Sequence, residues 1–434
     1  MPRAHIIGAG LAGLSAAIRL AEADYRVALY EAGPQAGGRC RSYFDEVLGC
    51  RIDNGNHLLM SGNRAALAYL ATIGAADSLV GPEEALFPFV DLGTGERWTL
   101  SPNRGPLPYW LFDAQRRVPG SRLRDYLTGV KIARARPQDT VTALVGSNAA
   151  LFKRFWEPLA VAALNTEADQ GAAELLWPVL KETFGRGAAY CRPLVARDGL
   201  SESFVDPALA WLALKGGRLF TASRVRAIGF EEERATSLDF GSETVALEAD
   251  DVVVVAVPPA VAATLVPELI VPTEFRSIVN AHFRLPETLA TEEVRILGVI
   301  GGTAEWVFRR HDLASVTVSA ATRIVDDEAE SLAARLWADV AAALALPMDP
   351  MPPWRIVKEK RATFAQTPEQ VRRRPAARTR WRNLALAGDW TNTGLPATIE
   401  GAIRSGEAAA RCVRDTAYQR NRNSAARWLA PSAL

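Results

Sequence analysis

The feature that most constrains this chain is a glycine-rich turn near the N-terminus, placed between an apolar segment and a helix rich in Ala and Leu. Residues 5–7 read as a short buried strand, and residues 11–23 as the helix. In Gly8-Ala-Gly10-Leu-Ala-Gly13, the first glycine permits a tight turn, the second lets the backbone approach a pyrophosphate, and the third lets helix pack on strand. The helix N-terminus adds free N–H groups and a partial positive charge. We therefore expect the phosphates of a dinucleotide to contact Gly8, Gly10, Leu11, Ala12 and Gly13.

An acidic residue and a second glycine pair extend this motif. Residues 27–30 read as the next strand, and Glu31 ends it 18 residues after Gly13. An acid at this place accepts hydrogen bonds from an adenosine ribose. Gly37-Gly38-Arg39 follows, which suits a flavin dinucleotide better than a nicotinamide one, with Arg39 reaching a phosphate. An ordinary α/β turn explains neither Glu31 nor the second pair, although Arg39 alone is equally well read as a surface charge.

A second motif lies near the C-terminus. Residues 383–388 read as a strand that stops at Gly388-Asp389, and residues 394–406 open a helix that we expect to run to about Arg414. Asp389 is placed to accept a hydrogen bond from a flavin ribityl hydroxyl. Pro396 suits the first helical turn, from which the positive helix end would face the flavin ring. The alternative is a strand–turn–helix unit with a capping Asp. We expect further cofactor contacts from Gly388, Asp389, Pro396, Ala397, Thr398 and Ile399, and from Val225 in the segment 217–228.

Composition narrows the class of protein. A chain of 434 residues can bury a large core, and we expect two domains. Its formal net charge of +1 gives no reason to expect a nucleic-acid partner. The four cysteines lie far apart without CxxC or metal-ligand spacing, which predicts reduced thiols in a cytosolic protein and no metal site. Glycines interrupt the apolar N-terminus, so we do not read it as a signal peptide. The longest apolar stretch, residues 252–266, is too short to cross a bilayer.

The motifs divide between remote parts of the chain, so we expect a discontinuous domain that binds FAD. It would comprise residues 1–90, 215–270 and 385–415; within it, residues 252–257 are a β-branched run typical of a buried parallel strand. Residues 91–214 and 271–384 would form the substrate-binding domain, and residues 416–434 a C-terminal tail. The predicted fold class is α/β: a Rossmann-like FAD-binding domain with an inserted mixed α+β substrate domain.

These blocks resemble the flavin amine oxidase and phytoene desaturase superfamily over most of the chain. More narrowly, the chain resembles the bacterial squalene-associated FAD-dependent enzymes, the hydroxysqualene dehydroxylases. The narrower resemblance lies in residues 53–59, 156–166, 358–364 and 388–406. One departure is Asn56, where relatives are expected to carry Gln; the amide chemistry survives with a shorter reach.

The resemblance implies an amine-oxidase-like fold and a reduction. Hydroxysqualene, a C30 isoprenoid, would lose its allylic hydroxyl as water, reduced FAD would supply hydride, and squalene would result for squalene and hopanoid biosynthesis. The leaving hydroxyl needs a proton or hydrogen-bond donor. His57, one of four histidines, is the first candidate. The polar neighbours expected around it are Asn54, Asn56 and Asn165.

Each of these candidates has a structural alternative. His57 would equally cap its own loop or merely touch the flavin, and Asp53 would position that loop. Glu400 lies in the first turn of the C-terminal helix, where a capping role is more natural than proton transfer. Trp390 is read as core packing at least as well as a flavin contact.

Residues 104–136 carry many basic residues with aromatics among them. This combination suits contact with an anionic membrane surface, and equally a solvated basic helix over a hydrophobic core. A hydrocarbon substrate is nearly insoluble in water, so we expect a cytoplasmic protein at the inner face of the cytoplasmic membrane. No second GxGxxG for NADPH is evident, so the electron donor would be a separate reductase or NADPH met directly.

Two other functions remain open at this level. A carotenoid-type desaturase or an amine oxidase would run the flavin in the opposite direction, and FAD motifs do not distinguish these reactions. A non-catalytic isoprenoid carrier with this fold has no use for an FAD site. The intact glycine and acidic motifs therefore argue against a carrier.

Overall fold

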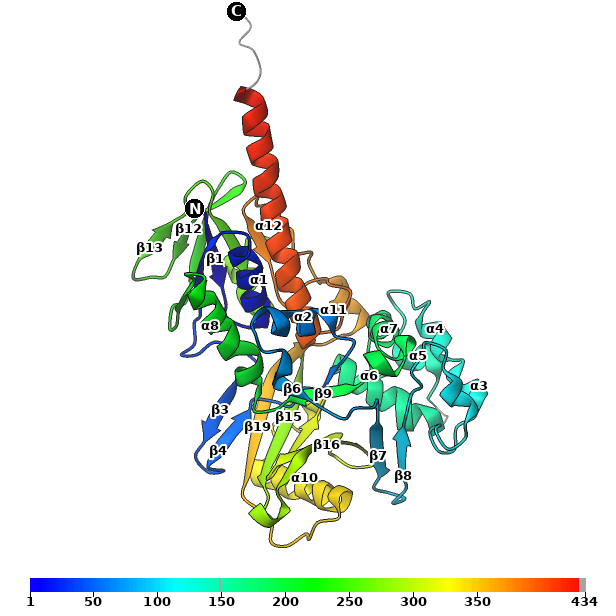
Figure 1. The fold of residues 1–434 in the computed structure, drawn as a ribbon. Helices are drawn as coiled ribbons and strands as arrows, with labels where there is room; N and C mark the ends of the chain where they lie inside the picture. The colour runs from blue at the N-terminus through cyan, green and yellow to red at the C-terminus, as the bar shows by residue number, and fades with distance from the viewer. Residues whose placement is uncertain (148–149, 429–434) are drawn as a thin grey trace, which may run out of the picture.

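The computed structural model describes residues 1–147 and 150–428, without the side chains of residues 292 and 416–428. A five-stranded parallel sheet in the order β10-β2-β1-β14-β20 forms the upper part of the molecule (Figure 1). Its strands come from the start, middle and end of the chain: β1 (Arg3–Ile7), β2 (Arg26–Tyr30), β10 (Arg218–Phe220), β14 (Val252–Val255) and β20 (Leu384–Leu386). β14 consists of four fully buried valines, as a central parallel strand requires. The discontinuous Rossmann-like arrangement is therefore present.

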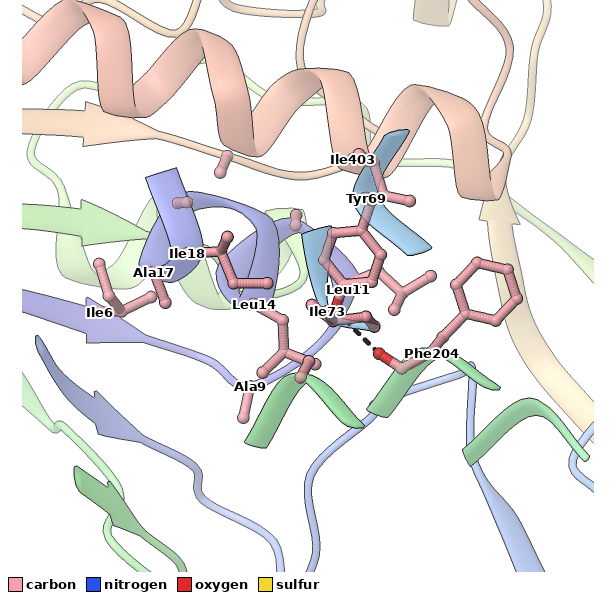
Figure 2. Packing of buried hydrophobic residues seen from close by; sticks show 14 of the residues in the cluster. Ile6, Ala9, Leu11, Leu14, Ala17, Ile18, Tyr69, Ile73, Phe204 and Ile403 are labelled. Carbon is pink, nitrogen blue, oxygen red and sulfur yellow. Dashed lines mark hydrogen bonds between the residues drawn. The ribbon is translucent and has the colours of Figure 1, made fainter. Parts of the chain in front are cut away.

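Helices from both ends of the chain pack together beside this sheet. α1 (Leu11–Ala21) lies against α12 (Ile399–Trp428) so closely that a Cβ at Gly406 would come within 2.2 Å of the Ala12 carbonyl oxygen. Figure 2 shows their shared apolar core, to which α2 (Arg64–Thr72) contributes. The Tyr69 hydroxyl donates a hydrogen bond of 2.8 Å to the Phe204 carbonyl there. This core fixes the helix whose N-terminus faces the predicted phosphate site.

A seven-stranded sheet forms the second large layer, in the order β19-β15-β18-β17-β16-β7-β8. All its neighbours are antiparallel except β16 and β7. One face is covered by α10 (Ala329–Leu344) through a core of Val, Leu and Trp side chains. The strands are β7 (Phe87–Asp91), β8 (Arg97–Leu100), β15 (Phe275–Arg284), β16 (Thr291–Ile300), β17 (Trp306–His311), β18 (Leu313–Val318) and β19 (Trp354–Phe364).

Shorter elements complete the fold. A helical region beside β7 and β8 contains α3 (Leu123–Tyr126), α4 (Gly129–Ile132), α5 (Val141–Val145), α6 (Glu157–Leu164) and α7 (Ala173–Glu182). The helices α8 (Asp206–Leu214), α9 (Pro259–Leu265) and α11 (Pro368–Arg372) lie elsewhere. Three small sheets comprise β3 (Ser42–Asp45) with β4 (Cys50–Asp53), β5 (Leu59–Met60) and β6 (Leu79–Val80) with β9 (Pro193–Ala196), and β11 (Ala227–Glu231) with β12 (Arg234–Asp239) and β13 (Thr244–Ala246).

The structure corrects several predicted boundaries. α12 begins at Ile399 and continues to Trp428, beyond the predicted end at Arg414, because residues 407–428 contain neither Gly nor Pro to stop a helix. Much of the expected tail is therefore helical, and residues 429–434 lie outside the described part. β7 begins inside the predicted segment 1–90 yet belongs to the large sheet. α8, assigned to the segment 91–214, packs on α1 because its apolar face completes that core. Within the described residues, no helix combines the length and apolar character needed to cross a bilayer.

Candidate functional site

The two glycine motifs of the N-terminal region meet at the start of α1. The amide of Gly37 donates a hydrogen bond of 2.8 Å to the carbonyl of Ala9. A Cβ on Gly38 would lie 3.3 Å from the Cα of Gly10. Gly37 and Gly38 have φ values of +104° and +58°, which side chains disfavour. The second glycine pair therefore passes directly beside the first motif, as a close backbone approach requires.

Gly10 and Gly13 have different surroundings. A Cβ on Gly13 would lie 2.0 Å from the carbonyl oxygen of Gly8, so this glycine is required for packing the helix against the turn. A Cβ on Gly10 would meet nothing within 4 Å. Gly10 also begins α1 with no side-chain cap and no acidic residue in the first turn, which leaves the first N–H groups free of capping side chains. This combination is a cradle for an anion.

Glu31 holds the turn from the end of β2. One oxygen of its carboxylate accepts a hydrogen bond of 2.9 Å from the amide of Ala9, and the other accepts one of 2.8 Å from the amide of Gly33. Each oxygen retains a second lone pair with which a ribose hydroxyl can bond. The chain after β10 runs alongside, where Ser223 donates its amide to the Glu31 carbonyl and Val225 is buried in the cluster of Ile7. Glu31 and Val225 thus lie at one edge of the sheet.

Arg39 and Asp389 bring the start and the end of the chain together. The guanidinium Nη2 lies 2.7 Å from Oδ1 of Asp389, and Nη1 donates to the carbonyl of Ala362. Oδ2 of Asp389 makes no hydrogen bond to the described residues, so it is free for a ligand hydroxyl. The structure thus pairs Arg39 with a carboxylate. About 44% of the Arg39 side-chain surface stays accessible, which leaves room for the predicted contact with a phosphate. That contact stays a prediction.

The segment 396–399 enters α12 differently from the prediction. Pro396 lies three residues before the helix, so it shapes the entering loop rather than the first turn. The hydroxyl of Thr398 accepts a hydrogen bond of 3.1 Å from the amide of Gly401 and caps the helix. The amide of Ala397 donates to Oε1 of Gln366 at 3.0 Å. The end of the loop is therefore fixed directly before the helix, and the positive helix end lies at Ile399.

The loop that carries His57 lies on a polar face of the large sheet. Asn280 and Thr317 stand opposite each other on β15 and β18, and alternation places both on the face away from α10. The amide nitrogen of the Asn56 side chain donates 3.1 Å to the Thr317 hydroxyl, and the Asn56 backbone amide approaches Oδ1 of Asn280. The Asn54 side chain reaches Glu359 at 3.4 Å. These contacts hold the predicted loop against the sheet.

His57 is neutral at physiological pH. Burial lowers the pKa of its imidazole to about 4, and nearby Arg39 acts in the same direction, while Asp53 opposes it. His57 makes no hydrogen bond to any described residue, so its N–H can be offered to a ligand. A half-buried, neutral imidazole can polarise a hydroxyl as a hydrogen-bond donor.

Asp53 and Asn165 are parts of the scaffold. Asp53 accepts hydrogen bonds from the Ser42 hydroxyl and the Leu200 amide, and Arg310 pairs with its second oxygen at 3.2 Å. Asp53 therefore positions the loop, as its structural alternative predicted.

Asn165 ends α6 in a left-handed conformation and bonds to Thr363, Arg276 and Ala320. Its side chain is buried and engaged with three parts of the backbone and sheet. Both amide protons are therefore used by the scaffold, and the expected place of Asn165 among the polar neighbours of His57 stays a prediction.

The capping and packing alternatives also hold for Glu400 and Trp390. Glu400 accepts hydrogen bonds from the amides of Ala65 and Ala66, so it caps α2 rather than its own helix. Trp390 is buried and donates its indole N–H to the carbonyl of Val257 at 2.9 Å.

Comparison with known proteins gives this arrangement its family. The family described as flavin containing amine oxidoreductase matches residues 11–414. A hydroxysqualene dehydroxylase from Rhodopseudomonas palustris is 49% identical over 94% of this chain and 97% of its own length. Those from Sinorhizobium fredii and Zymomonas mobilis are 47% and 46% identical, each over 94% of this chain and over 98% and 97% of their own lengths. The chain belongs to the hydroxysqualene dehydroxylase family, within the flavin-containing amine oxidoreductases.

Solved structures place the fold of this hydroxysqualene dehydroxylase family member among amine oxidases. A putative protoporphyrinogen oxidase from Exiguobacterium gives a TM-score of 0.67 at 17% identity, covering 96% of this chain and 99% of the other. A putrescine oxidase gives 0.68 at 16% identity, covering 95% and 99%. These likenesses confirm the α/β amine-oxidase-like fold.

The residues present fit FAD, the cofactor of this flavoprotein family. The start of α1 is uncapped beside open space at Gly10, which suits a pyrophosphate. Glu31 and Asp389 each retain oxygen lone pairs for hydroxyl groups. The individual contacts remain predictions.

Two residues with evident roles were missed by the sequence analysis. Arg374 is buried and donates hydrogen bonds to the carbonyls of Asp389, Thr391 and Leu395, so it shapes the loop that enters the flavin motif. Glu305 precedes β17 and accepts the Ser319 amide at 2.8 Å, and burial raises the pKa of its carboxyl to about 7. Neither lies in a recognisable motif, and Arg374 is one of six arginines between residues 372 and 382, so its sequence does not single it out.

Proposed function

We propose that this protein reduces hydroxysqualene to squalene with FAD as cofactor. The observation that carries the proposal is the identity of 46–49% with three hydroxysqualene dehydroxylases over 94% of the chain. The supporting observation is that the cradle for FAD, the polar loop at residues 53–58 and the large sheet form continuous parts of one fold. A non-catalytic carrier would not need this cradle.

The reaction balances as the loss of hydroxide with one proton, as water, and the gain of one hydride at the allylic carbon. When bound and reduced, FAD supplies that hydride. The chain must bind the cofactor, orient the isoprenoid, exclude water and assist the leaving hydroxyl. The N-terminal glycines and Glu31 serve the first task.

His57 assists the leaving oxygen in this proposal. Its neutral imidazole donates an N–H hydrogen bond to the substrate hydroxyl, and Asn56 and Asp53 hold the loop in place through the contacts described above. Glu305 is a second candidate proton donor: its backbone amide donates to the carbonyl of Thr317, whose hydroxyl accepts from Asn56, and burial raises the pKa of its carboxyl to about 7. The two roles predict different pH dependences.

Electrons reach the flavin, in this proposal, from a separate reductase or from NADPH met in solution. We also propose that the protein works in the cytoplasm and takes its water-insoluble substrate from a membrane surface. The physical reason is that a C30 hydrocarbon partitions almost completely into a bilayer.

Anaerobic single turnover tests the function. Holoenzyme reduced with dithionite is mixed with hydroxysqualene, flavin absorbance is followed, and the organic extract is analysed by mass spectrometry. We expect squalene in an amount equal to the reoxidised flavin. A flavin that stays reduced with hydroxysqualene, but is reduced from the oxidised state by a carotenoid or an amine, would contradict the proposal in favour of the oxidases.

A further inference from the structure

Exposed apolar side chains are concentrated in one short segment. Of the thirteen large apolar side chains exposed among the described residues, six lie between residues 107 and 130. The most exposed of them are Phe112 at 72%, Leu127 at 65% and Tyr109 at 63%. The six are Leu107, Tyr109, Phe112, Leu123, Leu127 and Val130.

The same segment has a local excess of positive charge. Residues 104–136 contain eight Arg or Lys and two Asp, although the whole chain has a net charge of only +1. Arg104, Arg122, Lys131 and Arg134 are exposed and form no ion pair with any described residue. The acidic Asp125 is engaged by the Arg122 backbone amide. The charge is therefore available to a partner.

Buried aromatic contacts join the two apolar parts of the segment into one surface. Trp110 is the buried residue of the 3-10 turn Tyr109–Phe112, and its ring makes an edge-on contact with that of Tyr126 in α3, with 5.6 Å between centroids. The hydroxyl of Tyr126 bonds to Val118 and Ser121, which fixes the connecting loop. α3 and α4 lie at the right-hand edge in Figure 1, far from the nucleotide-binding sheet. The docking surface, defined as residues 104–134, is thus an anchored outer edge.

We propose that this docking surface binds the anionic face of a phospholipid bilayer, with Leu, Tyr and Phe side chains inserted and Arg and Lys on the headgroups. Exposed apolar side chains and unpaired basic ones within one segment match the two layers of a membrane interface, an apolar boundary beneath negative headgroups. A protein partner would have to supply both complementary features, whereas an anionic bilayer has them throughout. The inference rests on the proposed function for the isoprenoid that would be collected there.

Vesicle sedimentation of the holoenzyme tests the binding without turnover. Vesicles of phosphatidylcholine alone and with 30% phosphatidylglycerol, the latter fraction chosen as roughly that of an anionic bacterial membrane, are compared at low and high salt. We expect binding to anionic vesicles, little to neutral ones, and release by salt. Replacing three charges should lower the partition coefficient at least tenfold, since each Lys or Arg contributes about fivefold. The variant carries R122Q, K131Q and R134Q.

An apolar variant and matched controls keep the test sharp. The variant with Y109S, F112S and L127S should also lose binding. Two control variants each replace three exposed residues elsewhere on the chain. The charge control carries R218Q, R335Q and R382Q, and the apolar control carries L214S, I270S and M348S. Circular dichroism and FAD content confirm that each variant is folded.

Three results would overturn the docking surface. The first is equal binding by wild type and both variants, and the second is absence of binding to anionic vesicles. The third is a wild-type dimer that the apolar variant converts to a monomer, which would assign the surface to a second copy of the chain. Turnover separates this inference from the proposed function. With detergent-dispersed hydroxysqualene the variants should match wild type, and with vesicle-embedded substrate they should be at least tenfold slower. Failure of turnover in both forms concerns the proposed function alone.

Discussion

At the scale of residues, Gly10 and Gly13 of one motif are required for different reasons. Ala at position 13 would put a Cβ 2.0 Å from the Gly8 carbonyl oxygen, whereas at position 10 it would enter open space. We expect Gly13→Ala to lower the free energy of unfolding by about 1–3 kcal/mol, as overpacking does. Gly10→Ala should unfold like wild type but bind FAD at least tenfold more weakly. Urea denaturation and FAD titration of deflavinated protein measure the two effects, and normal FAD binding by Gly10→Ala would show that the open space is not the pyrophosphate site.

His57 and Glu305 can be separated by pH. With a pKa of about 4, His57 stays neutral from pH 6 to 8, so its role as a hydrogen-bond donor gives a flat rate over that range. A proton from Glu305 would give a rate that falls as pH rises through about 7. We expect a flat profile and a loss of about 100-fold in the rate of flavin reoxidation for His57→Ala, with FAD binding unchanged. A falling profile that Glu305→Gln abolishes would move the role to Glu305.

His282 gives a stability test of the same polar face. Its Nδ1 bonds to the Ser315 hydroxyl at 2.8 Å, and burial lowers the pKa of the imidazole to about 4. The unfolded chain binds a proton at this histidine near pH 6.5, whereas the folded protein does so only near pH 4. The contribution of His282 to stability is therefore fully present above pH 6.5 and is lost as pH falls towards 4. We expect the free energy of unfolding to fall by about 3 kcal/mol over that range. The fall should be smaller in His282→Gln. Urea titrations at pH 5 and 7.5 measure it, and exposed His311→Asn, the matched control, should keep the wild-type difference.

At the scale of elements, the sequence predicted the helices and strands whose position depends on neighbouring residues alone. The strand–turn–helix at residues 3–21 is confirmed, because its glycines and apolar periodicity act within one short segment. The start of α12 was placed too early because Pro396 is acceptable both in a first turn and before one. What fixes it at Ile399 is the Thr398 cap together with Gln366, and Gln366 is a distant residue. No local pattern in the sequence reveals such a partner.

The loop before α12 is the element that depends most on one side chain. Arg374 donates to three of its carbonyls, and although burial lowers the pKa to about 10 the guanidinium stays charged at neutral pH. Lys lacks the fork needed to reach them together. We expect Arg374→Lys to lower the free energy of unfolding by about 3 kcal/mol and to weaken FAD binding. Thermal unfolding and FAD content report both, and exposed Arg372→Lys, a few residues away, should leave both unchanged.

At the scale of the whole molecule, the fold class and the discontinuous sheet followed from the sequence, but the exact boundaries did not. β7 and α8 were assigned to the wrong sides because the apolar face of an element does not reveal which core it joins. Only the strand order and the packing partner decide, and both involve residues more than a hundred positions away. The bonds of Asn165 to the scaffold could not be predicted for a related reason, since its partners lie on two other strands and a turn.

The convergence of remote segments makes stability depend on FAD. The cradle at Gly10 and the Asp389 carboxylate form only when both ends of the chain are folded together, and Arg39 links them at 2.7 Å. FAD that binds only the folded state therefore stabilises the whole molecule, by about 2.7 kcal/mol at 100 times its dissociation constant and about 1.4 kcal/mol more for each further tenfold. We expect the Tm of deflavinated protein to rise steadily with added FAD. Arg39→Gln should shift that curve to higher FAD concentration, whereas deleting residues 416–434 should not, because the described core of α12 ends at Val413. A Tm independent of FAD would mean that the two ends do not share one ligand.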